Sequence, residues 1–69
     1  MKHKFHVASD DQLFVERKGD MIDVGKIYFT GKEYCWLIDD TVMTKRHINL
    51  LNASFCVEMA NFLKTYKPQ

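Results

Sequence analysis

Apolar residues follow two different periods along the chain, one in each half. Up to about residue 38 they alternate with polar residues, which is typical of β-strands that bury one face. From about residue 44 they recur every three or four residues, the spacing of an amphipathic helix. The pattern predicts an α+β domain: an antiparallel β-meander of four to five short strands over residues 4–38, packed on one face by a C-terminal helix over residues 44–66.

Turn-forming residues divide the first half of the chain into short strands. The turns are predicted at Ser9-Asp10-Asp11, Lys18-Gly19 and Gly31-Lys32. A glycine in the first position of a two-residue loop, as at Gly31, suits a type II′ hairpin turn. The strands that these turns bound are residues 4–8, 13–17, 21–24, 27–30 and 33–38.

The two hairpin turns fix which residues share a face of the sheet. Opposed residues lie on one face and neighbours along a strand alternate, so Ile27 is expected opposite Trp36 and Tyr28 opposite Cys35. The face predicted to form the core carries Leu13, Val15, Ile22, Val24, Ile27, Phe29, Tyr34, Trp36 and Ile38. The other face, called the second face from here on, carries Gln12, Phe14, Glu16, Met21, Asp23, Lys26, Tyr28, Thr30, Glu33, Cys35 and Leu37.

One conflict in this assignment predicts a β-bulge. Val24 and Ile27 should both point into the core, but they are three residues apart and would point opposite ways in an uninterrupted strand. Gly25 lies between them, and glycine inside a strand pattern often marks a bulge or a tight bend. A bulge at Gly25 is therefore expected.

The pattern of the second half of the chain is compatible with either one helix or two. Apolar residues at mean helical spacing predict one continuous helix, whereas Asn52-Ala53-Ser54 favours a short helix followed by a longer one from about residue 53. The candidate N-terminal caps are Asp39, Asp40 and Thr41. The apolar stripe comprises Ile48, Leu51, Phe55, Met59, Phe62 and Tyr66.

Size and composition narrow the function classes. With 69 residues the chain is expected to form a single domain, residues 1–69, of marginal stability. The net charge of +1 argues against a strong sequence-independent nucleic-acid binder, and no apolar run is long enough for a membrane span. The start carries no secretory pattern, which predicts a soluble cytoplasmic protein. Cys35 and Cys56 are interpreted as small buried hydrophobes, with a disulfide as the alternative for an exported protein.

Candidate chemistry is sparse, and no cofactor, metal or catalytic residue is predicted. The amino-terminal Met1-Lys2-His3 has the ligand spacing of a square-planar Cu(II) or Ni(II) chelate, but it requires only one histidine. Phosphate-binding glycine motifs and nucleophile motifs are absent from the sequence. The chain is therefore expected not to be an enzyme.

The second face carries the functional hypothesis. About half of its residues are apolar or aromatic, although one layer of helix cannot also cover this side. We expect a non-enzymatic protein-protein interaction module that binds another protein or a second copy of itself, as a regulator or inhibitor of the kind that phages and mobile elements encode. The expected anchors are Phe14, Met21, Tyr28 and Leu37. In the alternative interpretation, the N-terminal strand or a curled sheet covers this face itself.

A nucleic-acid-binding regulator is the alternative function. Basic residues outnumber acidic ones in the second half of the chain, and two hairpin tips also carry lysines. Such a regulator would use the tips and the start of the helix to contact phosphates. The residues assigned to this role are Lys18, Lys32, Lys45 and Arg46.

Overall fold

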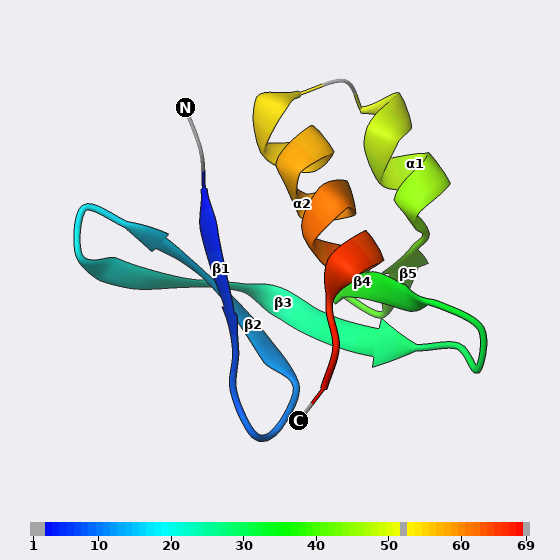
Figure 1. Cartoon of the computed structure of the whole chain (residues 1–69), viewed down its shortest axis with the longest axis horizontal. Helices are drawn as coiled ribbons and strands as arrows, with labels where there is room; N and C mark the ends of the chain where they lie inside the picture. The colour runs from blue at the N-terminus through cyan, green and yellow to red at the C-terminus, as the bar shows by residue number, and fades with distance from the viewer. Residues whose placement is uncertain (1–2, 52, 69) are drawn as a thin grey trace.

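The computed structural model describes residues 3–51 and 53–68, and it confirms the α+β meander. Five antiparallel strands follow one another in chain order, and two helices come after them (Figure 1). The strands are β1 Lys4–Val7, β2 Gln12–Arg17, β3 Asp20–Phe29, β4 Tyr34–Ile38 and β5 Thr41–Met43. The helices are α1 Lys45–Leu50 and α2 Ser54–Thr65.

Both two-residue hairpin turns form as predicted, and they set the register. Ile27 pairs with Trp36 and Tyr28 with Cys35 across the Gly31-Lys32 turn. Lys18 and Gly19 both have positive φ, at 51° and 84°, which is the backbone of a type I′ turn. The two turns therefore set the pairing of the strand segments next to them in β2, β3 and β4.

The bulge at Gly25 is confirmed, and it joins two predicted strands into one. Residues 21–24 and 27–30 were expected as separate strands, but β3 runs through both. Leu13 pairs with Gly25 and Phe14 with Asp23, which leaves Val24 as the extra residue. The Trp36 indole N–H donates to the Val24 carbonyl oxygen at 2.6 Å, which holds the bend.

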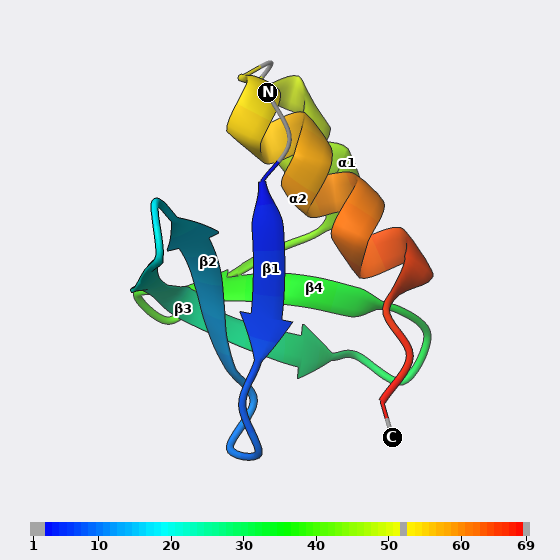
Figure 2. The same cartoon turned by 60° about the vertical axis from the view of Figure 1, so that its left-hand side comes forward.

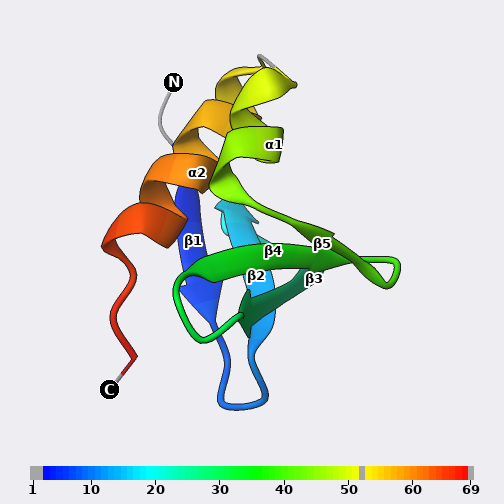
Figure 3. The ribbon, with the colours of Figure 1, turned by 90° about the vertical axis from the view of Figure 1, so that its right-hand side faces the viewer.

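The helical half adopts the two-helix version, and the continuous helix over residues 44–66 is wrong. Thr44 caps α1, and its hydroxyl accepts a hydrogen bond from the His47 backbone N–H. Leu51 closes α1 and is 55% exposed, so it does not belong to the apolar stripe. Asn52 lies outside the described residues. The break lets the two helices pack side by side over the sheet (Figure 3).

The caps predicted at Asp39, Asp40 and Thr41 are also wrong. Asp39 and Asp40 have positive φ, at 48° and 64°, and form the turn between β4 and β5. Thr41 begins β5, a strand that the sequence pattern did not predict. Aspartate tolerates the left-handed backbone better than most residues, so the same residue type serves a turn as readily as a cap.

The core lies between the sheet and the two helices. Its fully or nearly fully buried members are Leu13, Ile27, Trp36, Ile48, Cys56, Met59, Ala60 and Leu63. Phe29 and Ile22, both predicted for the core, are exposed instead. Each lies on a part of β3 away from the bend, and the β2–β3 and β3–β4 hairpins extend past the helices on both sides (Figure 1). The length of the helical layer, not strand alternation, therefore limits the core.

Candidate functional site

The second face keeps the four predicted anchors at or near the surface. Met21 is 51% exposed and Tyr28 is 46% exposed, while Phe14 and Leu37 are half-buried. Both helices pack on the opposite side of the sheet (Figure 3). The N-terminal strand does not cover the second face, because β1 extends the sheet as its edge strand and turns Phe5 toward α2.

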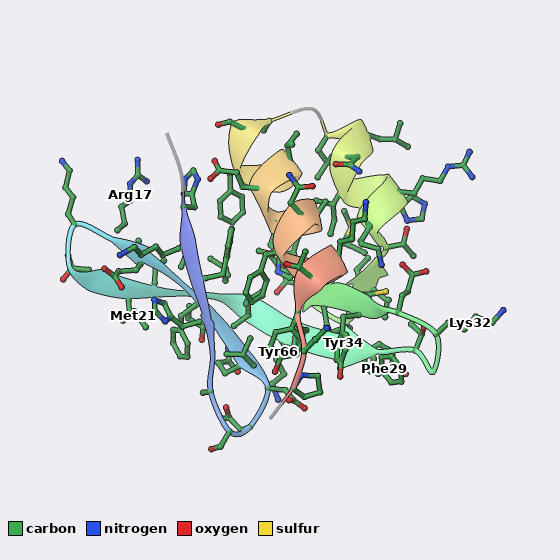
Figure 4. All side chains as sticks on the ribbon, in the orientation of Figure 1. Arg17, Met21, Phe29, Lys32, Tyr34 and Tyr66 are labelled. Atoms are coloured by element: carbon green, nitrogen blue, oxygen red, sulfur yellow. The ribbon has the colours of Figure 1, made fainter. Side chains whose placement is uncertain are left out.

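The bend at Gly25 separates the four anchors into two pairs. Phe14 and Met21 belong to the β2–β3 arm, whereas Tyr28 and Leu37 belong to the arm formed by β3 and β4. Figure 4 shows Met21 on the left arm, well away from the β3–β4 hairpin. The Gln12–Lys26 cross-strand pair lies between the two arms. The sequence predicted one apolar patch, and the structure contains two.

Strand β5 adds a residue to the second of these patches that sequence reasoning missed. Val42 pairs with Leu37, shares its face and is 39% exposed. The signal in the sequence was weak but present, since Thr41-Val42-Met43 is a short apolar alternation after a turn-forming aspartate pair. Tyr28, Leu37 and Val42 together form what we call the Tyr28 patch.

Cys35 is the exception on the second face, because the chain itself buries it completely. Lys45 Nζ lies 2.8 Å from Glu33 Oε1, and both charges act on the thiol. Burial raises the pKa of the Cys35 thiol, Glu33 raises it further and Lys45 opposes the change. A protonated thiol is a poor nucleophile, so Cys35 is a structural residue.

Both cysteines match the interpretation made from the sequence. Cys35 and Cys56 are buried and unpaired. Cys56 belongs to the main core, whereas Cys35 lies on the other side of the sheet.

The four residues of the nucleic-acid alternative are not brought together. Lys18 lies in the β2–β3 turn and Lys32 in the β3–β4 turn, at opposite ends of the molecule (Figures 1 and 4). Lys45 forms an ion pair with Glu33, while Arg46 is exposed on α1. A nucleic-acid role for these residues stays a prediction.

The amino-terminal Met1-Lys2-His3 sequence, which has the ligand spacing of a chelate, falls partly outside the described residues, since Met1 and Lys2 are not described. The backbone N–H of His3 donates to Glu58 Oε1, and His3 Nδ1 lies 2.9 Å from Glu58 Oε2. These are the two His3 atoms that a Cu(II) or Ni(II) chelate would use. Among the described residues, no group of three or more metal-ligating side chains lies close together.

The contact between His3 and Glu58 predicts a pH-dependent contribution to stability. The hydrogen bond from the His3 backbone N–H, followed by that from its side chain, lowers the pKa of the Glu58 carboxyl. A lowered folded-state pKa stabilises the fold above the unfolded-state pKa, near 4.5, and this stabilisation is lost as the pH falls through the folded value.

Glu58→Gln is therefore expected to lower the urea midpoint at neutral pH. The difference from wild type should shrink as the pH falls below 4.5 and vanish once the pH lies below the lowered folded-state pKa of Glu58. Glu16→Gln is the matched control, because Glu16 Oε1 also bonds a histidine, His6, but at an exposed site where such pairs contribute little. A difference that persists unchanged in acid would contradict the prediction.

None of the helices in residues 3–51 and 53–68 is long and apolar enough to cross a bilayer.

Comparison with protein-family models, with curated proteins and with solved structures gives no match. What the chain does has therefore to follow from the geometry of its own surfaces.

Proposed function

We propose that the chain is a non-enzymatic protein-binding module that binds through its second face. The observation that supports this proposal is the exposure of large apolar side chains there, on the side of the sheet away from the helices. Tyrosine and methionine are enriched at the centres of protein interfaces, and contiguous exposed apolar area tends to mark interaction sites. The partner is another protein or a second copy of the chain.

The Tyr28 patch is the centre of the proposed interface, and Phe14 with Met21 forms a second contact on the other arm. Lys26 lies between the two and places a positive charge beside the Tyr28 patch. An aromatic centre with a charged rim is the usual anatomy of a protein interface. Because the two arms meet at a bend, a partner that engages both needs a surface shaped to that angle.

Binding of this kind requires no catalytic group, so the proposed activity is occlusion of a partner's surface or adaptor binding. We place the protein in the cytoplasm, a reducing compartment in which Cys35 and Cys56 stay as free thiols. Small regulators or inhibitors from phages and mobile elements are the class of protein proposed for this role.

Tyr28→Ala compared with Phe29→Ala tests the proposal. The two residues are adjacent in β3 and similarly exposed, at 46% and 51%, but they lie on opposite faces of the sheet. We expect Tyr28→Ala to lose at least about tenfold in affinity for a captured partner, because a central aromatic anchor often contributes 2 kcal/mol or more. Phe29→Ala should retain binding, and both variants should unfold at similar urea concentrations.

The same variants address the alternatives. If the partner is a second copy, the mass in solution should fall from dimer to monomer in Tyr28→Ala only. Equal loss of binding in both variants would contradict a role for the second face. Nucleic acid that co-purifies with the protein and dissociates steeply with salt would favour the nucleic-acid alternative.

A further inference from the structure

A groove made of two neighbouring hollows lies between β1 and α2, on the side of the sheet opposite the second face. Its upper part, of about 320 Å³, is lined by His3, Phe5, Glu58, Asn61, Phe62 and Thr65. Its lower part, of about 660 Å³, lies between β1 with the following turn and the C-terminal residues after α2. The two parts share Phe5 and Phe62 as lining residues and are together called here the β1–α2 groove. Figure 2 shows β1 beside α2, the two elements that provide most of the lining.

One wall of this groove is a free sheet edge. Within residues 3–51 and 53–68, β1 pairs with β2 and with no other strand. The Ala8 backbone N–H donates to the Gln12 carbonyl oxygen at 2.9 Å, which makes this a hydrogen-bonded pair. Because such pairs alternate along an antiparallel ladder, the backbone N–H and C=O groups of Phe5 and Val7 point away from β2. They are placed to pair with a further strand.

The floor of the groove is aromatic. The ring centroids of Phe5 and Phe62 are 5.1 Å apart, and those of Phe62 and Tyr66 are 5.6 Å apart. All three rings are only half-buried by the chain itself. An apolar side chain that entered from a bound strand would cover them and remove that apolar area from water.

The upper end of the groove offers hydrogen-bond acceptors and negative charge. Glu58 lies there, and hydrogen bonds from His3 lower the pKa of its carboxyl, so it is ionised at neutral pH. The Thr65 hydroxyl already donates to backbone carbonyls of its own helix, at 3.2 Å to Asn61 O and 3.3 Å to Phe62 O. Its hydroxyl proton is therefore engaged within α2, and its oxygen offers lone pairs to the groove.

The spacing along α2 matches that of an extended chain. Glu58 and Phe62 are four residues apart, which is a rise of about 6 Å along a helix. Side chains on one face of a strand recur about every 6.6–6.8 Å. One side chain of a bound strand can therefore reach Glu58 while the next on the same face covers Phe62.

We propose that the β1–α2 groove binds an extended peptide segment in which a basic residue and an apolar residue are two positions apart. The segment pairs with the free edge of β1, its apolar side chain covers Phe5 and Phe62, and its basic side chain contacts Glu58. Addition of a strand to a sheet edge, with pockets for alternate side chains, is a general mode of peptide recognition. The groove shares no anchor with the second face, so this proposal and the proposed function fail independently.

The test selects displayed random heptapeptides on the full chain and measures labelled copies of the selected peptides by fluorescence anisotropy. Asn61→Trp and Thr65→Trp each place an indole in the groove from an exposed position on α2. Both variants should weaken binding by at least about tenfold, the loss expected when a central contact is blocked. Lys64→Trp is the matched control, because Lys64 is exposed on α2 but does not line the groove, and it should bind within about twofold of wild type.

The peptide and the edge strand provide further tests. Exchange of the peptide's basic residue for glutamate should weaken binding to wild type, but much less to Glu58→Gln. Val7→Pro removes an N–H that faces the groove and leaves the ladder with β2 intact, since proline is tolerated on sheet edges. It should also weaken binding by about tenfold, because a buried acceptor on the peptide loses its partner.

Three results would overturn the proposal. The first is that selection enriches no peptide, and the second is that the selected peptides bind both indole variants as tightly as wild type. The third is a dimer in solution that Val7→Pro dissociates, because the edge of β1 would then pair with a second copy. Peptide binding that survives in Tyr28→Ala is expected, since the groove and the Tyr28 patch are separate.

Discussion

Replacement of Gly25 by alanine is expected to unfold most of the protein at 25 °C. Gly25 has a φ of +117°, and an added Cβ would lie 2.5 Å from the Leu37 carbonyl oxygen and 3.1 Å from Trp36 Nε1. Backbone strain contributes about 1–3 kcal/mol and overpacking about as much again. A domain of this size has roughly 3–5 kcal/mol of stability in total, so the loss is comparable with the whole. Urea titration followed by Trp36 fluorescence would measure it.

Gly19→Ala is the control for this prediction. Gly19 also has positive φ, at +84°, but nothing lies within 4 Å of the position that a Cβ would take. The substitution should cost only about 1 kcal/mol, the price of placing a non-glycine residue in a left-handed conformation. Equal losses of unfolding free energy in the two variants would contradict this prediction. They would show that the glycine is required only for its positive φ, and not because β3 approaches β4 closely at Gly25.

Replacement of Ile48 by alanine is expected to destabilise the protein strongly and to release α1 from the core. Ile48 is fully buried and is the only buried residue of α1. Truncation of a buried isoleucine to alanine usually costs about 2–5 kcal/mol, because it removes packing and leaves a cavity. A helix of six residues has no stability of its own, so without this contact α1 should detach from the core. Urea midpoints and amide exchange of α1 would show both effects.

Leu51→Ala is the matched control, since the apolar stripe in the sequence groups Leu51 with Ile48. In the structure Leu51 is 55% exposed, so its truncation should change the free energy of unfolding by no more than about 0.5 kcal/mol. Similar losses in Ile48→Ala and Leu51→Ala would contradict the two-helix arrangement. They would instead support a continuous helix that carries both residues on its buried face.

The candidate surfaces depend on sequence to different degrees. Strand alternation was enough to assign Phe14, Met21, Tyr28 and Leu37 to one face, because side chains in a strand point alternately to its two sides. Their division into two patches was not predictable, because it depends on how far the sheet bends at Gly25. The β1–α2 groove could not be predicted either, since it joins elements about 50 residues apart in the chain.

Local sequence is sufficient to predict the register of β2, β3 and β4 and the position of the bulge. Two-residue turns and a glycine in a strand restrict the backbone of the residues next to them, and this restriction does not depend on contacts with the rest of the chain. Local information also predicted that helix would follow sheet. These features need no knowledge of contacts between distant residues.

Contacts between distant parts of the chain determine where the helix breaks, that Thr41–Met43 pairs as β5, and that Phe29 remains exposed. In each case the local signal allowed two outcomes of similar free energy. Asp39 and Asp40 suit a turn as well as a cap, and Leu51 suits a helix as well as its end. The burial of Ile48 and Met59 against the sheet then selects one outcome, because burying such side chains is worth more than these local preferences.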